Sequence, residues 1–303
     1  MYIAYLDLLG FSYFVESDLE GANRLLSSYL QIFNFRNQPY YRNESRGGIF
    51  TIDSIQDFIP FSDSVVITSE DINSFLPQLS RFLLDSFLYH GKSMRFPERA
   101  ESPHETTVSN VEIENAQIVT TQSLQNWYPV LFRGGISSGE VNRGIVPSIY
   151  NASNYEYPIF TGMPVVQAVR LEQSGHQGPR ILINSGVISD INDNASLLVG
   201  PQFDMNNEHT ELYWPAIIFY NTEDYESNLK NEFAELFDIS IVLWKAYRIN
   251  SRIERQYFNF MRLIYKSGKS IFERNNWDME MFRETVNTCF RVAELTEVSG
   301  LLD

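Results

Sequence analysis

The stretch Tyr2-Ile-Ala-Tyr-Leu-Asp7-Leu-Leu-Gly10-Phe-Ser12 decides the fold that the sequence predicts. The apolar run over residues 2–9 has a period of two, which predicts a strand with Ile3, Tyr5 and Asp7 on one face. After Gly10 the apolar side chains recur at helical spacing instead, over roughly residues 15–35. We therefore expect a strand whose following helix packs back on it.

Three further segments extend this start to a β-α-β-β-α-β plan. Ile55–Phe61 and Ser64–Thr68 are strand-like and are separated only by Ser62-Asp63, which predicts a tight hairpin. A second amphipathic helix is expected over Phe75–Phe87, and the strand-like segment Val130–Val141 completes the plan. This order predicts an α+β fold with a ferredoxin-like βαββαβ core.

The segments after this core predict extra strands and a helical extension. They are a helix at about residues 163–174, a strand at Arg180–Asn184, and a weaker strand pair at Leu197–Val199 and Leu212–Ile218. From about Glu223 onward the pattern is helical, with a final helix from about Asp278 to Leu295. We therefore expect a main domain over residues 1–222 and a C-terminal helical extension over residues 223–303.

One part of the main domain has no regular pattern. Residues 91–110 lose all periodicity and carry Pro97 and Pro103 among charged residues, which indicates a mobile surface loop. The whole insertion is expected to span about residues 91–127, between the second helix and the strand-like segment Val130–Val141.

The composition predicts a folded, soluble protein and disfavours nucleic acid as a partner. Of the 303 residues, 44% are hydrophobic and 14% are aromatic, which excludes disordered and low-complexity classes. The net charge of −15 repels phosphate backbones and anionic lipid. No signal peptide is visible, and no apolar run reaches the roughly eighteen residues of a membrane span. We expect a cytoplasmic protein without direct membrane contact, and the single cysteine, Cys289, fits a reducing compartment.

Residues 245–274 reverse the sign of the chain's charge. They hold eight basic side chains, Lys245, Arg248, Arg252, Arg255, Arg262, Lys266, Lys269 and Arg274, against the acids Glu254 and Glu273. Because the rest of the chain is strongly acidic, we expect this segment to lie against the acidic core of its own or of a second chain. A solvated basic face is the alternative.

Two carboxylates stand at positions where strands end. Asp7 ends the first strand, and Asp63 lies at the turn of the hairpin. In a βαββαβ sheet these strands can be neighbours, so both carboxylates could converge on Mg²⁺ or Mn²⁺, which prefer oxygen ligands. Gly10-Phe11-Ser12 then opens the first helix, where free backbone N–H groups favour an anion. Metal ions beside an anion site suggest a nucleoside triphosphate.

Four motifs in this order resemble the catalytic domain of class III nucleotidyl cyclases. They are Asp7-Leu-Leu-Gly-Phe-Ser, Ser62-Asp63, Arg133-Gly-Gly-Ile-Ser-Ser-Gly-Glu-Val, and Gly162-Met-Pro-Val-Val-Gln-Ala-Val-Arg170-Leu-Glu. The set spans residues 1–174, a little over half of the chain. Its style is most similar to the stand-alone pyrimidine cyclases of bacterial Pycsar anti-phage systems.

The resemblance implies the role of each matched residue. Asp7 and Asp63 would bind two metal ions, one activating the ribose 3′-hydroxyl and the other holding the triphosphate, with Gly10, Phe11 and Ser12 as part of the nucleotide site. Arg170 would stabilise charge at the α-phosphate. In this family the metal ligands and that arginine come from opposite subunits, which implies a homodimer with composite active sites. The product would act on a separate cyclic-nucleotide effector.

The departures from the family pattern concern the sugar and the base. Val166 occupies the place of the ribose-orienting Asn, so another polar group must orient the ribose or the site is degenerate. Ile59 and Ile159 occupy the two purine-reading places, and apolar side chains cannot satisfy a purine edge. Asp57, on the same strand face as Ile59, is a candidate acceptor for a base N–H group, with a solvated strand acid as the alternative. The sequence therefore predicts a pyrimidine nucleotide cyclase acting on UTP or CTP, and the resemblance makes UTP, and thus a uridylate cyclase, the narrower expectation.

Two other functions stay open at this point. The first is an adenylate or guanylate cyclase that reads its base in an unusual way. The second is a catalytically inactive, nucleotide-binding regulatory domain, which the loss of Asn at Val166 would suit. The family's phosphate-binding Lys has no clear match, and one of the basic residues of 245–274 could replace it.

Overall fold

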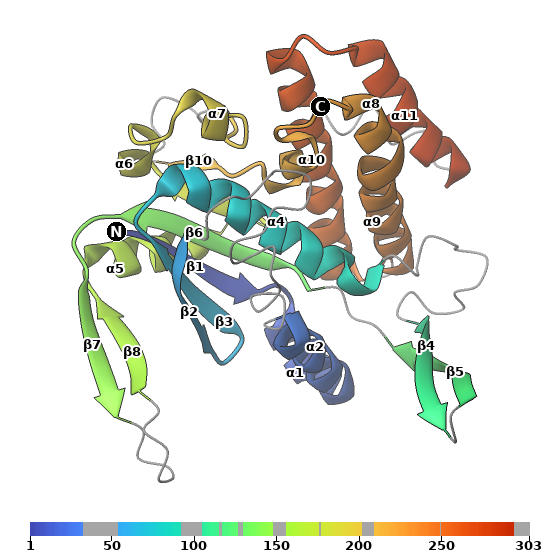
Figure 1. Cartoon of the computed structure of the whole chain (residues 1–303), viewed down its shortest axis with the longest axis horizontal. Helices are drawn as coiled ribbons and strands as arrows, with labels where there is room; N and C mark the ends of the chain where they lie inside the picture. Colours follow the sequence, from blue (N-terminus) through green and yellow to red (C-terminus); the bar gives the residue numbers. More distant parts are fainter. Residues whose placement is uncertain are drawn as a thin grey trace.

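The structure is a computed structural model that describes residues 1–32, 54–91, 105–114, 117–126, 130–147, 156–175, 177–201, 209–248 and 250–293. Figure 1 shows how its elements are arranged. In chain order they are β1 (Tyr2–Leu8), α1 (Phe11–Ser17), α2 (Leu19–Ile32), β2 (Ile55–Phe61), β3 (Ser64–Ser69), α4 (Ile72–Gly91), β4 (Glu105–Glu114), β5 (Gln117–Asn126), β6 (Phe132–Ser138), β7 (Asn142–Pro147), β8 (Glu156–Thr161), α5 (Met163–Glu172), β9 (Ile181–Asn184), α6 (Ser185–Ile188), α7 (Asp193–Ser196), β10 (His209–Glu211), the 3₁₀ helix η4 (Trp214–Phe219), α8 (Tyr225–Asn228), the π-helix η5 (Leu229–Phe233), α9 (Ala234–Ala246), α10 (Ser251–Arg274) and α11 (Met279–Val292).

A six-stranded mixed sheet with the strand order β10-β9-β6-β1-β3-β2 forms the centre of the molecule. β1 is antiparallel to both of its neighbours, β3 and β6, and β2 is antiparallel to β3. β9 extends the sheet parallel to β6, and β10 pairs with β9 at the edge. Because β6-β1-β3-β2 is the strand order of a βαββαβ unit, the predicted α+β fold with a ferredoxin-like core and extra strands is confirmed.

One face of the sheet is apolar and is covered by α2 and α4. Leu6 and Leu8 of β1 point to this face and are buried. Phe132 of β6 joins both helices to the sheet, since its ring contacts Tyr29 of α2 and Phe82 of α4. Burying these large side chains stabilises the fold through the hydrophobic effect.

The opposite face, which we call the α5 face, carries the alternate residues of β1, including Tyr5 and Asp7. α5 lies on it at very close range: a Cβ atom on Gly135 would stand 2.3 Å from the backbone oxygen of Ala168. The helix can therefore rest on β6 only because residue 135 is glycine. This close packing brings the last turn of α5, with Glu172, down onto the sheet.

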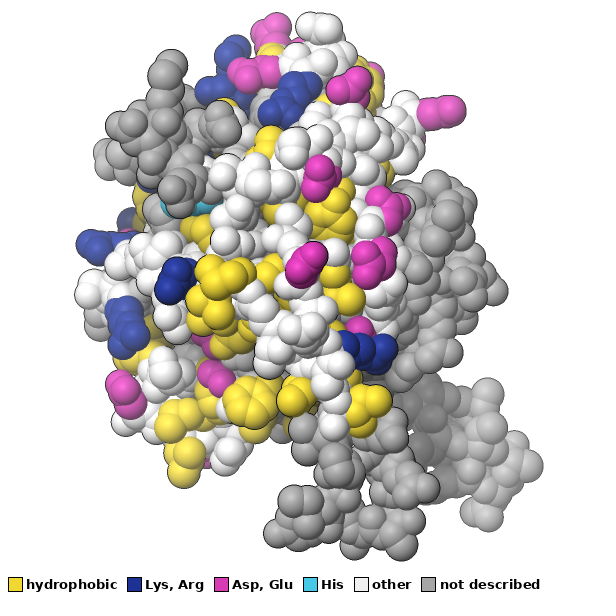
Figure 2. Space-filling model, turned by 90° about the vertical axis from the view of Figure 1, so that its left-hand side faces the viewer, with side chains coloured by type: hydrophobic (Ala, Val, Ile, Leu, Met, Phe, Trp, Pro, Cys, Tyr) yellow, Lys and Arg dark blue, Asp and Glu magenta, His cyan; other side chains and the backbone are white. Residues whose placement is uncertain are grey.

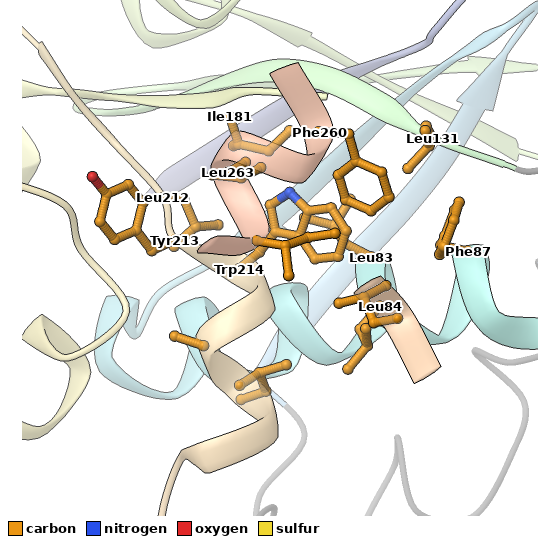
Figure 3. Close-up of a cluster of buried hydrophobic side chains, with 14 of the residues drawn as sticks. Leu83, Leu84, Phe87, Leu131, Ile181, Leu212, Tyr213, Trp214, Phe260 and Leu263 are labelled. Atoms are coloured by element: carbon orange, nitrogen blue, oxygen red, sulfur yellow. The ribbon is translucent and has the colours of Figure 1, made fainter. Parts of the chain in front are cut away.

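The C-terminal helices are joined to the sheet by aromatic packing rather than by a separate core. Trp214 of η4 stacks on Phe260 of α10 with 5.4 Å between ring centroids, and Phe87 of α4 packs edge-on against Phe260 at 4.9 Å. Figure 3 shows these rings among leucines of α4 and α10. The indole N–H of Trp214 donates to the carbonyl oxygen of Pro179, 3.1 Å away, so the buried ring has no unpaired donor. The division at residues 222 and 223 stays a prediction.

Helices were correctly expected after Glu223, but several boundaries differ from the prediction. The segment Leu212–Ile218 is not a strand: most of it lies in the 3₁₀ helix Trp214–Phe219, where Pro215 occupies the first turn and lacks the N–H that a ladder needs. Its partner Leu197–Val199 keeps a single bridge, between Val199 and Leu212.

The first predicted helix is two helices, and the predicted loop holds a hairpin. Asp18 interrupts the helical pattern between α1 and α2, and its carboxylate accepts the backbone N–H of Gly21 at 3.0 Å. Within the predicted insertion, β4 and β5 form a regular antiparallel ladder from Glu105 opposite Asn126 to Glu114 opposite Gln117. These strands are rich in Thr, Val and Ile, which favour strands. Residues 92–104 of the insertion lie outside the described residues.

In the described part of the chain, every helix is too short or too polar to cross a lipid bilayer.

Truncating a core leucine should cost far more stability than the same change on the surface. Leu84 is fully buried in α4, so Leu84→Ala should lower the free energy of unfolding by about 2–5 kcal/mol through lost burial and the cavity left behind. Leu30 of α2 is 54% exposed, and Leu30→Ala should change it by less than about 0.5 kcal/mol. Urea unfolding of both variants checks this; equal losses would mean that α4 does not form the core described.

Candidate functional site

Asp7 lies at the centre of a hydrogen-bonded cluster on the α5 face. The register places it between Ser64 of β3 and Arg133 of β6. Ser64 Oγ donates to Asp7 Oδ1 at 3.0 Å, and Arg133 donates to Oδ2 from Nη2 at 3.0 Å and from Nε at 3.2 Å. Since Ser64 uses its only proton on Asp7, the hydroxyl of Tyr5 must be the donor in its 2.8 Å bond to Ser64 Oγ. A continuous polar chain thus crosses three strands.

Arg133 is shared between two carboxylates. Its Nε atom also lies 2.7 Å from Oε1 of Glu172, whose side chain is only 4% exposed. The Nε–H bond is directed at Asp7, so Glu172 Oε1 is buried close to the guanidinium yet accepts no hydrogen bond from any described residue. Such an oxygen is costly to bury, so Glu172 is poised to accept more of Arg133.

Burial dominates the electrostatics of both acids. It raises the pKa of Asp7 above its usual value, although the charge of Arg133 and the hydrogen bonds from Ser64 and Arg133 act in the opposite direction. Burial also raises the pKa of Glu172, again against the effect of Arg133. The negative charge of Asp63 raises the pKa of both groups further, which shows that the three carboxylates share one field.

Asp63 lies beside Asp7, as the sequence predicted for neighbouring strands. Its backbone oxygen accepts the N–H of Leu8 at 2.9 Å, so the hairpin turn is bonded directly to the end of β1. Ser62 in the same turn has a φ of 56°, a left-handed conformation that a tight hairpin requires. The turn and the strand end therefore hold the two aspartates at the same end of the sheet's inner strands.

The predicted nucleotide loop follows directly on β1. Gly10 has a φ of 86°, which a residue with a side chain would adopt only with strain, and it begins α1. Phe11 packs against the hydrophobic core, whereas Ser12 is exposed. α1 is only seven residues long, so its dipole contributes little to anion binding.

Asp57, the predicted acceptor for a base, already has partners. Arg143 of β7 donates to its Oδ1 at 2.8 Å and Thr68 to its Oδ2 at 2.9 Å. The side chain of Asp57 is 10% exposed, while that of Arg143 is 57% exposed. Ile59 lies two residues further on the same face and is partly buried. A base could therefore reach Asp57 only by replacing the exposed guanidinium of Arg143.

The remaining predicted residues lie on an outer surface, apart from Asp7. Arg170 and Val166 are exposed on α5, and Ile159 is exposed on β8. No described hydrogen bond or ion pair joins Arg170 to Asp7 or Asp63 within the chain. Exposed apolar side chains surround this region: Phe61, Ile145, Ile159, Met163 and Val166, between 42% and 77% exposed. Figure 2 faces the side with α5, β7 and β8, and shows hydrophobic side chains gathered over its lower half.

Besides Tyr5, which the sequence placed on the same strand face as Asp7, three members of the cluster have no role in the sequence-based site: Arg133, Ser64 and Glu172. A signal was present for each. Arg133 and Ser64 flank Asp7 once the strand order of a βαββαβ sheet is applied, and Glu172 ends the motif that contains Arg170. What could not be read from the sequence was that α5 would bring Glu172 within reach of Arg133.

The donor set beside the hairpin suits a hard divalent cation. Asp7 and Asp63 offer only oxygen, the ligand type of Mg²⁺ and Mn²⁺. The described residues contain no group of three or more His, Cys, Asp or Glu side chains arranged around a metal. Ligands beyond the two aspartates would have to be backbone oxygens, water or phosphate, which is common for Mg²⁺.

The comparisons with known proteins do not identify a function for the chain. No family model matches the chain, and no curated protein does. Eight chains of solved structures match. One is a bacterial light-regulated adenylyl cyclase, 16% identical, with a TM-score of 0.35 over 70% of this chain and 86% of that chain. At this level of likeness, a function has to be argued from the site itself.

Removing Arg133 should destabilise the fold, and a second change should restore part of the loss. Arg133→Met strands the carboxylates of Asp7 and Glu172; because solvent reaches the guanidinium, which is 43% exposed, we expect a loss of about 1–3 kcal/mol. Adding Glu172→Gln removes one stranded charge, so the double variant should be more stable than Arg133→Met in urea unfolding at pH 7.

The matched control is Arg24→Met, which removes an arginine paired with the exposed Glu20 and should change stability little. A double variant no more stable than Arg133→Met would show that Glu172 and Arg133 are not coupled.

Proposed function

We propose that this protein is a nucleotidyl cyclase that converts a pyrimidine nucleoside triphosphate, UTP or CTP, into its 3′,5′-cyclic monophosphate and pyrophosphate. The observation that carries the proposal is the closeness of Asp7 and Asp63 beside the Gly10 loop: the backbone oxygen of Asp63 accepts the N–H of Leu8, the residue after Asp7, and the charge of Asp63 raises the pKa of Asp7. The resemblance of four ordered motifs to class III cyclases supports it. By that resemblance, the product serves as a second messenger for a separate effector in bacterial anti-phage defence.

The residues present fit two bound Mg²⁺ or Mn²⁺ ions. When bound, such ions make the 3′-hydroxyl more acidic and neutralise the triphosphate. Asp7 and Asp63 would hold them. Oδ1 of Asp7 keeps a lone pair beside its bond from Ser64, whereas Oδ2 already accepts two N–H groups of Arg133. Arg133 competes for Asp7 as a cation. Glu172 supports the exchange, because its unpaired oxygen can take Arg133 when Asp7 turns to a metal.

The reaction forms one bond and breaks one. The 3′-oxygen of the ribose attacks the α-phosphorus and loses its proton to solvent, and the bond from that phosphorus to the bridging oxygen of the β-phosphate breaks, releasing pyrophosphate. Arg170 would stabilise the charge that develops on the α-phosphate. Since Arg170 is exposed on the outer side of α5, it would reach the site of a second chain. The exposed apolar residues of α5, β2 and β8 support such a homodimer, because monomers rarely leave a large apolar patch uncovered.

Two features favour a rival function, a nucleotide-binding domain without turnover. Val166 takes the place of the ribose-orienting Asn and projects from α5 with 42% of its surface exposed. In addition, Arg133 occupies Oδ2 of Asp7, so this oxygen can bind a metal only after the ion pair opens.

Incubation of the purified protein with Mn²⁺ and each of the four ribonucleoside triphosphates, followed by mass spectrometry, tests the proposal. We expect cyclic UMP or cyclic CMP, with the pyrimidine preferred over either purine by more than about tenfold in kcat/KM, because Ile59 and Ile159 offer a purine no hydrogen bonds. In Asp63→Asn, turnover should fall by at least about 100-fold with an unchanged circular dichroism spectrum.

A preference for a purine would instead indicate the unusual adenylate or guanylate cyclase. Nucleotide binding with no cyclic product would indicate the inactive regulatory domain.

Composite sites make a second, independent prediction. Asp63→Ala and Arg170→Ala should each be inactive, yet mixing the two chains should restore roughly a quarter of wild-type activity, because half of the dimers are mixed and each has one intact site. The matched control mixes Asp63→Ala with Asp7→Ala, where both sites of every dimer lack a metal ligand and no activity should return. Exchange of tagged chains must be verified; verified mixed dimers without activity would place Arg170 outside the site.

A further inference from the structure

A charged cavity, separate from the cluster around Asp7, lies between the loop before β9, strand β10 and the middle of α10. Its volume is about 190 Å³, and its lining includes Arg180, Glu211, Arg262 and Lys266. It shares no residue with the cluster around Asp7. Arg180 and Glu211 had no role in the site predicted from the sequence, whereas Arg262 and Lys266 belong to the basic residues of 245–274, one of which could replace the family's phosphate-binding Lys.

The cavity holds more positive than negative charge. Arg180 and Glu211 form a bidentate pair, with 2.5 Å from Nε to Oε1 and 2.8 Å from Nη2 to Oε2. Glu211 is buried, and both of its carboxylate oxygens accept hydrogen bonds from Arg180, so the two charges balance each other. Arg262 and Lys266 have no described acid as ion-pair partner, which leaves two positive charges on the described lining.

The arrangement of these two cations is costly without a ligand. They lie one turn apart on the same face of α10, where like charges repel. Nε of Arg262 is buried and has no hydrogen-bond partner among the described residues. Burial lowers the pKa of Lys266, and the nearby charge of Arg262 lowers it further, although Glu211 acts in the opposite direction. Both the orphaned donor and the repulsion would be relieved by one anion between the two side chains.

The other basic side chains of residues 245–274 have different neighbours. Most contact aromatic rings or backbone carbonyl oxygens: Arg248 over Trp244, Arg252 over Tyr13, Lys269 over Tyr265, Lys245 at Ala293, and Arg274 at Ser196 and Val199. The basic segment therefore does not act as one uniform charged face. Arg262 and Lys266 are its members that line a cavity.

We propose that this cavity is a binding site for a phosphate group, held by Arg262 and Lys266 and bordered by the Arg180–Glu211 pair. A dianionic phosphate matches the two uncompensated charges, and the guanidinium offers several donors to its oxygens. The volume sets the class of ligand: about 190 Å³ accommodates a phosphate group but is below the roughly 300 Å³ of a pocket for a drug-sized molecule. A whole nucleotide would not fit inside.

Isothermal titration with inorganic phosphate, without metal or nucleotide and at constant ionic strength with chloride as the balancing anion, tests the site directly. Wild type should bind one phosphate per chain, and Arg262→Gln/Lys266→Gln should weaken binding by at least about tenfold. The matched control, Arg255→Gln/Arg283→Gln, removes the same charge from exposed positions of α10 and α11 and should bind as wild type. Equal loss in the two double variants would reduce the effect to net charge and overturn the proposal.

Thermal unfolding separates a binding role from a structural one. Lys266→Gln relieves repulsion with Arg262, so its melting temperature without phosphate should equal or exceed that of wild type, while the rise caused by phosphate should disappear. A lower melting temperature with the phosphate effect intact would contradict the site. A small phosphate monoester is tested beside inorganic phosphate. Tighter binding of the monoester would indicate a phosphorylated metabolite as the ligand, and equal or weaker binding of the monoester would indicate the free ion.

Asp63→Asn keeps this result independent of the proposed catalytic activity. It removes a proposed metal ligand and leaves the cavity intact, so it should bind phosphate as wild type does. Loss of phosphate binding in Asp63→Asn would place the bound anion at the aspartates and overturn the assignment to α10. Failure of cyclisation with normal phosphate binding would affect only the proposed function.

Discussion

The approach of α5 to the sheet allows no side chain at residue 135. A Cβ atom there would stand 2.3 Å from the backbone oxygen of Ala168 and 2.5 Å from Cβ of Leu171, distances that real atoms do not tolerate. This single glycine lets the helix axis come down onto β6, and the last turn of the helix then delivers Glu172 to Arg133. Without that approach Asp7 would have one neighbouring cation and an open surface, and the buried cluster would not exist.

Strand β1 separates two kinds of environment. On one side of β1, Leu6 and Leu8 are buried among rings of α2, α4 and β6, where close packing stabilises the fold. On the other side, Asp7 sits in a polar cluster that costs free energy to desolvate and is only partly repaid by Arg133. Keeping a charged cluster at such a cost is typical of sites selected for function, which is why the apolar face explains the fold and the α5 face explains the chemistry.

Local pattern was enough for the core and for the adjacency of the two aspartates. β1 and the hairpin of β2 and β3 could be predicted from their strand-like apolar patterns. The pairing of β1 with β3 then brings Asp63 to the end of β1. Pro215 shows where the same reasoning fails, because an apolar run containing it fits a buried 3₁₀ helix as well as a strand. The contacts of Glu172 and Lys266 depend on the depth and rotation of helices, which tertiary packing sets and sequence spacing does not. The predicted metal, nucleotide and subunit roles remain predictions, because no pattern within one chain tests them.

The charges around Asp7 bear directly on how a substrate could approach. Asp7 and Glu172 share the guanidinium of Arg133, and the negative charge of Asp63 acts on both acids, so the described cluster is negative overall and by itself repels a triphosphate. Divalent cations would reverse that sign, which makes them a physical requirement of any phosphate chemistry at this end of the sheet. The cavity on α10 has the opposite balance and needs no metal to attract phosphate. A backbone hydrogen bond of 3.0 Å from Gly134 to Arg180 joins β6, which carries Arg133, to the residue before β9. The two sites of opposite sign therefore lie on either side of β6 in the strand order. An anion that binds without metal should choose α10, while one that binds only with metal should choose the aspartates.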